Sequence, residues 1–246
     1  MKPLLHAELI KLRTTRTFYA LAGVAIGLSM LLTTLVAILA EPTQDSVLID
    51  VFTNDLSSIF IMILAIVGIT GEWRHRTITS SLLAAPERLR FLVAKVLAFA
   101  AAGAVLSVGI SIATAIVGYA ILESRDLPTP GLGEWVEQVG RIALVAALLG
   151  AFGLALGSLI RNQPTAIVAV LILGFVIEPT LVALLPEVGR YTTGVLTTAI
   201  QGIDPEDAGL SETDPPAAGV AFAAMLVWIG VPFAAGAALL KSRDVE

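Results

Sequence analysis

The sequence contains no cysteine, only two histidines and few charged residues. Without cysteine the chain can form no disulfide, no thiolate zinc site and no iron–sulfur cluster. Charged residues make up 14% of the 246 residues, against about 25% in a typical soluble domain. Hydrophobic residues make up 57%, and the mean hydropathy is +0.89. This composition predicts an integral membrane protein.

Nucleotide-binding and proteolytic motifs are also missing. A phosphate-binding loop requires a Gly-Lys pair, and none of the four lysines follows a glycine. Both histidines, His6 and His75, lie in polar segments, so no base is available to activate Ser158 inside the membrane. We therefore expect no enzymatic activity from this chain, and any ATP-driven process would need a second polypeptide.

Long apolar runs, by contrast, are abundant. A helix needs roughly 20 mostly apolar residues to cross a bilayer core about 30 Å thick. Strand-like alternation of apolar and polar residues is absent, so the runs favour an all-α membrane protein with a single transmembrane domain. The six predicted spans cover residues 17–40, 56–71, 91–122, 142–160, 164–185 and 217–240, and Asp55 is expected at the outer edge of the second.

The distribution of lysine and arginine predicts the orientation, because cytoplasmic loops retain these residues. If the spans alternate, only three arginines lie on one side, Arg125, Arg141 and Arg190, and that side also carries most of the acids. Both termini are therefore expected in the cytoplasm. The twelve basic residues of the other side are Lys2, Lys11, Arg13, Arg16, Arg74, Arg76, Arg88, Arg90, Lys95, Arg161, Lys241 and Arg243.

Glycines recur within two spans. Small residues at such positions let membrane helices approach closely. We expect packing contacts at Gly150, Gly153 and Gly157 in the fourth span, and at Gly23 and Gly27 in the first.

Residues 1–16 have the pattern of a short amphipathic helix. Pro3 suits a first helical turn, and Leu5, Leu9 and Leu12 recur at helical spacing. His6, Glu8, Lys11 and Arg13 are predicted to occupy the wetter faces, with the cations near anionic lipid headgroups. The segment could equally be a basic flank that only sets the topology.

The longest cytoplasmic segment, 72–90, combines basic, hydroxyl and apolar residues. Ile78 and Leu82 are one helical turn apart and precede Pro86, which would end a short helix. Such a helix with a small apolar knob could dock into a groove on a soluble partner. Alternatively, the arginines of this segment bind lipid phosphate.

Glu178 is the one acidic residue expected within a span. An ionisable group at that depth costs a few kcal/mol, so it should face a polar cavity, pair with a cation or be protonated. Pro179 frees the carbonyl four residues back, and Thr180 adds a hydroxyl. Glu178, Pro179 and Thr180 are therefore candidates for a substrate path. The alternatives are that the span ends early and leaves Glu178 at the outer interface, or that Glu178 forms a structural pair.

At this point the sequence resembles a known family, the type-2 ABC exporter permeases. The similarity lies in the opening Glu8-Leu9-Ile10-Lys11-Leu12-Arg13 ahead of the first span, and in the loop after the second span. That loop contains Glu72, Thr77, a leucine pair at 82–83, Pro86 and, later, Lys95. Arg76 stands where the family usually has glycine.

The resemblance implies a permease subunit of an ABC exporter in a bacterial cytoplasmic membrane. It would have an interfacial elbow helix (Leu5, Leu9, Lys11, Leu12, Arg13) and a partly re-entrant segment, 188–200, before the last span. It would bind no cofactor itself. Its partners would be a second permease subunit, most simply a homodimer, and a cytoplasmic ATPase dimer that holds ATP and Mg. No nucleic acid is expected as a partner. The residues implied in ATPase coupling are Glu72, Arg76, Thr77, Ile78, Leu82 and Pro86.

Two other classes stay open. A stand-alone secondary transporter would fit an even 3+3 arrangement of spans, although such folds usually carry several intramembrane charges. A membrane scaffold without transport activity would have no polar cavity. The substrate is not defined by the sequence, and drug, antibiotic, peptide, lipid and ion export all stay open.

Overall fold

The computed structural model describes residues 2–74, 77, 87–160, 162–205 and 213–242. Over these residues the chain is helical, without a β-strand. Six helices are long and apolar enough to cross a membrane, which confirms the predicted number of spans. The helices are α1 (Lys2–Thr14), α2 (Arg16–Leu39), α3 (Val47–Phe52), α4 (Ser57–Arg74), α6 (Arg88–Ser124), α7 (Leu132–Leu159), α8 (Gln163–Ile172), the π-helix η1 (Leu173–Ile177), α9 (Glu178–Leu184), α10 (Pro186–Gly189), α11 (Thr193–Gln201) and α12 (Ala218–Ser242).

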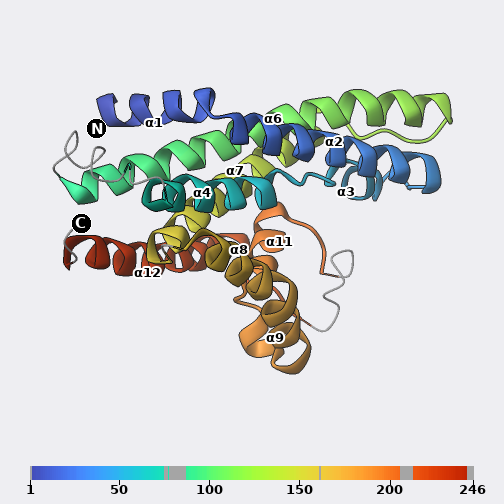
Figure 1. Ribbon diagram of the computed structural model, residues 1–246. Coiled ribbons are helices and arrows are strands. Elements are labelled where there is room, and N and C mark those ends of the chain that lie inside the picture. Colours follow the sequence, from blue (N-terminus) through green and yellow to red (C-terminus); the bar gives the residue numbers. More distant parts are fainter. Residues whose placement is uncertain (1, 75–76, 78–86, 161, 206–212, 243–246) are drawn as a thin grey trace.

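Helix α7 is the centre of the bundle and packs against α4, α6 and α12 (Figure 1). A side chain at Gly150 would meet the backbone of Phe99 on α6, and one at Gly153 would meet the backbone of Met62 on α4. Gly157 faces Ile66 and Ile69, also on α4. The predicted packing role of these three glycines is therefore confirmed.

The glycines of α2 differ. A Cβ atom added at Gly23 or Gly27 would meet no described atom within 4 Å, so the predicted packing contact is absent within the described part of the chain. Helix α2 instead buries a different face, which includes Ala25, Ser29 and Thr33.

The second span is longer than the sequence predicted. Residues 47–52, expected in the outer loop, form α3, which buries Val47, Val51 and Phe52. Its apolar face packs on α2 and α6, and this tertiary contact stabilises a helix too short to persist alone. The helix is interrupted at residues 53–56 and resumes as α4, so that α3 and α4 together form one candidate span.

After α8 the chain leaves the bundle and returns. Helix α8 packs on α4 and α7, residues 173–184 project from the rest of the molecule, α10 reverses the direction, and α11 runs back to pack on α7 and α12 (Figure 1). In the candidate span Gln163–Leu184, only 11% of the most apolar stretch is buried within the protein, against 61% in α7. The segment 188–200, expected to be partly re-entrant, lies in α10, the following turn and α11.

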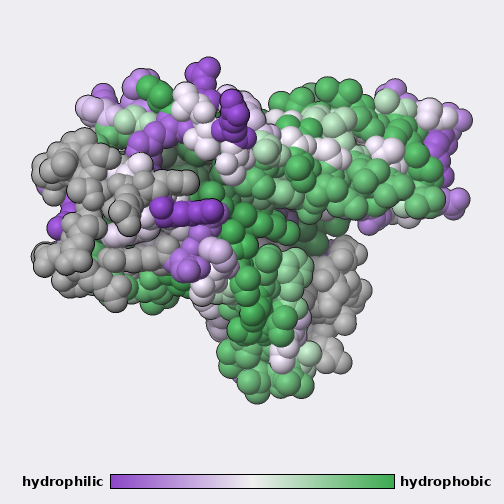
Figure 2. Space-filling view, viewed as in Figure 1, coloured by the Kyte–Doolittle hydropathy of each residue, from purple (hydrophilic) through white to green (hydrophobic). Residues whose placement is uncertain are grey.

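Both chain ends lie at the same end of the bundle (Figure 1). At that end of the bundle, Arg88 donates a hydrogen bond to the carbonyl of Leu240, which links the start of α6 to the end of α12. In Figure 2, hydrophilic side chains gather at α1 and at the opposite end of the long helices, with a broad apolar surface between them. This distribution suits a multi-pass membrane protein.

Candidate functional sites

The first site begins with the attachment of α1 to the bundle. Leu12 is buried and packs in the same apolar cluster as Ile61 of α4 and Phe91 of α6, while Leu5 and Leu9 cover its edge. The helical spacing of these leucines therefore holds α1 against the first turns of α6, where Figure 1 shows it lying alongside. Arg13 is exposed, and its carbonyl accepts a hydrogen bond from the Tyr19 hydroxyl.

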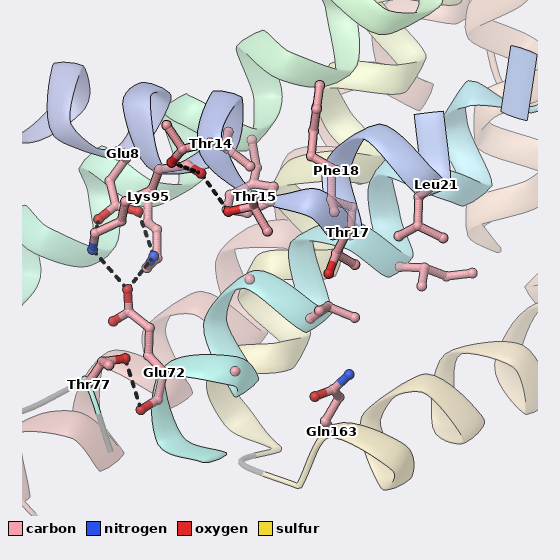
Figure 3. A pocket seen from close by; sticks show the side chains of 18 of the residues that line it. Glu8, Thr14, Thr15, Thr17, Phe18, Leu21, Glu72, Thr77, Lys95 and Gln163 are labelled. Atoms are coloured by element: carbon pink, nitrogen blue, oxygen red, sulfur yellow. Dashed lines mark hydrogen bonds and ion pairs between the residues drawn. The ribbon is translucent and has the colours of Figure 1, made fainter. Parts of the chain in front are cut away.

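Four charged side chains meet beneath this contact, from α1, α4 and α6 (Figure 3). The Lys95 ammonium lies 2.6 Å from Glu8 Oε2 and 2.8 Å from Glu72 Oε1. Lys11 Nζ lies 2.8 Å from Glu8 Oε1 and 3.1 Å from Glu72 Oε1. We call these four residues the charge cluster. Its two carboxylates and two ammonium groups balance, so a buried net charge is avoided.

Burial is uneven within the charge cluster. The side chain of Lys95 is 3% exposed, whereas that of Lys11 is 48% exposed. Lys95 also lies over the ring of Phe91, 5.4 Å from its centroid, within the range of a cation–π contact. Glu8 was expected on a wet face of α1, and this prediction is wrong: its side chain is 7% exposed because α1 turns it inward toward Lys95.

The charge cluster changes the proton affinity of the two residues on α1. Burial raises the pKa of the Glu8 carboxyl, but the charge of Lys95 and hydrogen bonds from Lys11 and Lys95 outweigh it, leaving this pKa below its ordinary 4.5. Burial lowers the pKa of Lys11, but its bond to Glu8 and the charge of Glu72 outweigh this and leave the pKa above 10.5. Each group is therefore held in its charged form at neutral pH.

A cavity of about 800 Å³ adjoins the charge cluster. It opens between α1, α2 and α4, and its wall includes Glu72, Phe18, Leu21, Phe99 and Gln163 (Figure 3). Glu72 Oε2 is buried here without a hydrogen-bond partner among the described residues, while Oε1 binds both lysines.

Only part of the predicted coupling segment is described. Glu72 is the buried acid near the end of α4, and the Thr77 amide donates to the Glu72 carbonyl at 2.9 Å, which starts the turn out of the helix. The predicted coupling residues Arg76, Ile78, Leu82 and Pro86 lie outside the described residues. The charge cluster thus holds the beginning of this segment.

The second site is formed around Glu178. Its Oε1 accepts hydrogen bonds from the Thr193 amide at 3.1 Å and the Thr193 hydroxyl at 2.5 Å, and its Oε2 accepts from the Gly194 amide at 2.8 Å. Thr193 and Gly194 begin α11, so the carboxylate lies at the positive end of that helix. Glu178 is 5% exposed and therefore not a surface residue of the chain. Its partner is a helix terminus rather than a cation.

The helix opens at Glu178 as its sequence predicts. Pro179 has no N–H to donate, and the Glu178 amide bonds the Leu173 carbonyl five residues back, which widens the turn into η1. The Thr180 hydroxyl donates to the Val176 carbonyl at 2.5 Å. Pro179 and Thr180 are both exposed.

Glu178 lines a second cavity, of about 310 Å³, together with Asp55. Pro179 and Thr180 are not among its lining residues, so only one of the three predicted path residues reaches it. Asp55, which the sequence placed merely at the outer edge of a span, is the residue that sequence reasoning missed. The sequence did contain an indication of its importance: Asp55 directly precedes the apolar run 56–71, which is too short to cross a bilayer alone.

No model of a known protein family matches the chain, and no curated protein is found to be similar to it.

Proposed function

We propose that this chain is the membrane-spanning permease subunit of an ABC exporter, driven by a separate ATPase dimer that docks on residues 72–86. The observation that supports it is the charge cluster. Glu72, which opens the proposed docking segment, is held by Lys95 of α6 and by Lys11 of α1. A push on this segment would therefore act on three helices together instead of bending one loop.

The rest of the proposal concerns placement and assembly. The end of the bundle that carries both termini and the 72–86 segment would face the cytoplasm of a bacterium, where the ATPase binds. A second copy of the chain would complete the translocation path. Both cavities are lined by at least one buried carboxylate, which favours transport over a membrane scaffold, since a scaffold has no need of such groups beside open space.

The decisive experiment starts from native membranes. The tagged chain is purified in mild detergent or a native nanodisc, and co-purifying proteins are identified by mass spectrometry. We expect a soluble ATPase with nucleotide-binding motifs, at one copy per permease. The reconstituted complex should hydrolyse ATP faster than the isolated ATPase.

One substitution at the start of the docking segment and one just beyond its end sharpen this test. Glu72→Ala should abolish most of the stimulation, because it removes the residue held by both lysines. Glu87→Ala is the matched control: Glu87 is exposed and its described ion pair is with Arg90, one helical turn away. Equal stimulation in the two variants would contradict a coupling role for Glu72.

Orientation has its own test. Single cysteines can be introduced without background, because the chain has none. Cysteines at Thr43 and Ser124, both exposed, should react with an impermeant maleimide on intact cells, and one at Thr77 should react only after permeabilisation. Labelling of the Thr77→Cys variant from outside would overturn the cytoplasmic placement.

A stand-alone secondary transporter is the second candidate, favoured by the two carboxylates that share the smaller cavity. It predicts that no ATPase co-purifies. Transport would then stop when a protonophore collapses the ion gradient and would continue in vesicles that lack ATP.

A further inference from the structure

The cavity shared by Asp55 and Glu178 lies between four parts of the fold. Its wall comes from residues 53–62 at the start of α4, the middle of α7, the stretch from α8 through η1 to the first residue of α9, and the length of α11. Its volume of about 310 Å³ is within the usual range for small-molecule sites. None of its lining residues is lysine, arginine or histidine.

The remainder of the wall is mixed but mostly apolar. Thr53, Ser58, Thr197 and Gln201 contribute polar groups. The apolar part of the wall includes Met62, Leu149, Phe152, Val170, Leu171 and Phe175. A ligand there would have its uncharged body against hydrocarbon and aromatic surface, with carboxylates nearby.

The two carboxylates are not equivalent. Both oxygens of Glu178 are used by the first turn of α11. Asp55 Oδ1 accepts from the Ser57 amide at 2.5 Å, whereas Asp55 Oδ2 is buried without a hydrogen bond of normal geometry among the described residues, and the Ser57 and Ser111 hydroxyls lie close to this carboxylate. Asp55 is therefore the carboxylate with capacity for a further partner.

One arginine beside the wall, Arg141, is already occupied. Arg141 lies 2.6 Å from Glu137 Oε1 and donates to the carbonyl of Gln201 at 3.2 Å. Arg141 bonds the carbonyl of Gln201, which lines the cavity, but Arg141 itself is not a lining residue. The negative charge of the cavity is thus left without an ion pair in the described part of the chain.

We propose that this cavity binds the transported substrate, that the substrate is a lipophilic organic cation, and that Asp55 recognises its charge. The substrate class rests on the proposed transport function; the binding site itself does not require an ATPase. A cation relieves the unbalanced negative charge, whereas an anion is repelled by it. The apolar wall selects an organic cation over a hydrated ion, because burying hydrocarbon supplies the remaining binding energy.

The test uses two ions of nearly the same shape and opposite charge, tetraphenylphosphonium and tetraphenylborate. Equilibrium dialysis measures their binding to the purified chain in nanodiscs of uncharged lipid, with empty nanodiscs subtracted. We expect saturable binding of tetraphenylphosphonium and none of tetraphenylborate. Borate binding as tight as that of phosphonium would overturn the proposal without any variant.

Asp55→Asn keeps the size of the side chain and the acceptor for the Ser57 amide. It should weaken phosphonium binding roughly ten- to a hundredfold, as expected for loss of a contact to a charged group. Asp50→Asn is the matched control, because Asp50 is an exposed acid on neighbouring α3, and its affinity should stay within about twofold of wild type. Unchanged affinity in a well-folded Asp55→Asn variant would overturn the role of Asp55.

Sodium separates an organic from an inorganic cation site. An excess of sodium should leave phosphonium binding unchanged, whereas tetraethylammonium at the same ionic strength should compete; competition by sodium would overturn the organic class. Phosphonium binding without a co-purifying ATPase would refute the exporter proposal alone. An ATPase complex that fails to discriminate the two ions would refute the substrate class alone.

Discussion

The chain buries acidic residues in two regions, and the two regions treat them in opposite ways. In the charge cluster, Glu8 and Glu72 face Lys11 and Lys95, and the four charges cancel. In the smaller cavity, Asp55 and Glu178 share a wall that has no basic residue in the part of the chain that the structure describes. Each region leaves one carboxylate oxygen without a hydrogen bond, Glu72 Oε2 or Asp55 Oδ2, but only the charge cluster balances its carboxylates with ammonium groups among the described residues.

This difference suggests a structural role for the charges of the charge cluster and a ligand-binding role for those of the smaller cavity. Buried ion pairs with matched geometry attach one element to another, and removing one member leaves the other uncompensated. A carboxylate that lines a cavity without a cation nearby loses hydration without gaining an ion pair, and a bound cation can compensate that cost. The charge cluster thus fits transmission between helices, and the cavity fits recognition.

The largest effect is expected from Lys95→Met in the charge cluster. Two carboxylates would then share one half-exposed lysine, so we expect the free energy of unfolding to fall by about 3–5 kcal/mol. Thermal unfolding of the purified chain would measure the change. Adding Glu8→Gln and Glu72→Gln to Lys95→Met should restore most of the stability; no recovery would mean that lysine packing, not charge, is responsible.

Glu178→Ala should have the next largest effect, because Glu178 satisfies the first turn of α11. Its loss leaves the amides of Thr193 and Gly194 unbonded, at a cost of about 2 kcal/mol. Glu178→Lys should be worse still, since it places a cation at the positive end of the helix. Glu187→Ala, at an exposed acid on α10, is the control and should unfold like wild type.

Acid should loosen α1 through Glu8. The folded pKa of Glu8 is lowered, so its contribution to stability is complete above about pH 4.5, the ordinary value, and is lost as the pH falls through the folded value. Hydrogen exchange of α1 amides should therefore accelerate in that acid range. Glu8→Gln should exchange faster already at neutral pH and respond less to acid; an unchanged acid response would assign the effect to other carboxyls.

Lys11→Met should have the smallest effect, below about 1 kcal/mol, since Lys11 is half-exposed and solvent screens its pairs. The same substitution type at Lys95 and Lys11 thus compares a buried with an exposed lysine bound to the same carboxylates. Equal destabilisation by Lys95→Met and Lys11→Met would show that burial does not distinguish them.

Much of the fold could be predicted because it depends on local composition. The six apolar runs become six candidate spans, the Pro179 position opens a π turn, and three glycines of α7 mark close helix contacts. Each follows from residues near one another in the sequence: apolar length, a missing amide or a missing side chain. The prediction failed where neighbours are distant, as for α3, which persists only against α2 and α6.

The sequence by itself determined how many helices can cross a bilayer, and it concentrated the basic residues in alternate loops, because both depend on the transfer of single segments between water and lipid. Only the tertiary structure decided which buried charges are neutralised. Glu8 and Lys95 are 87 residues apart and form a pair at 2.6 Å, whereas Asp55 and Glu178 meet at one cavity without a cation among its lining residues. Charge compensation depends on distances of a few ångströms between helices, and no period or local composition in the chain encodes them.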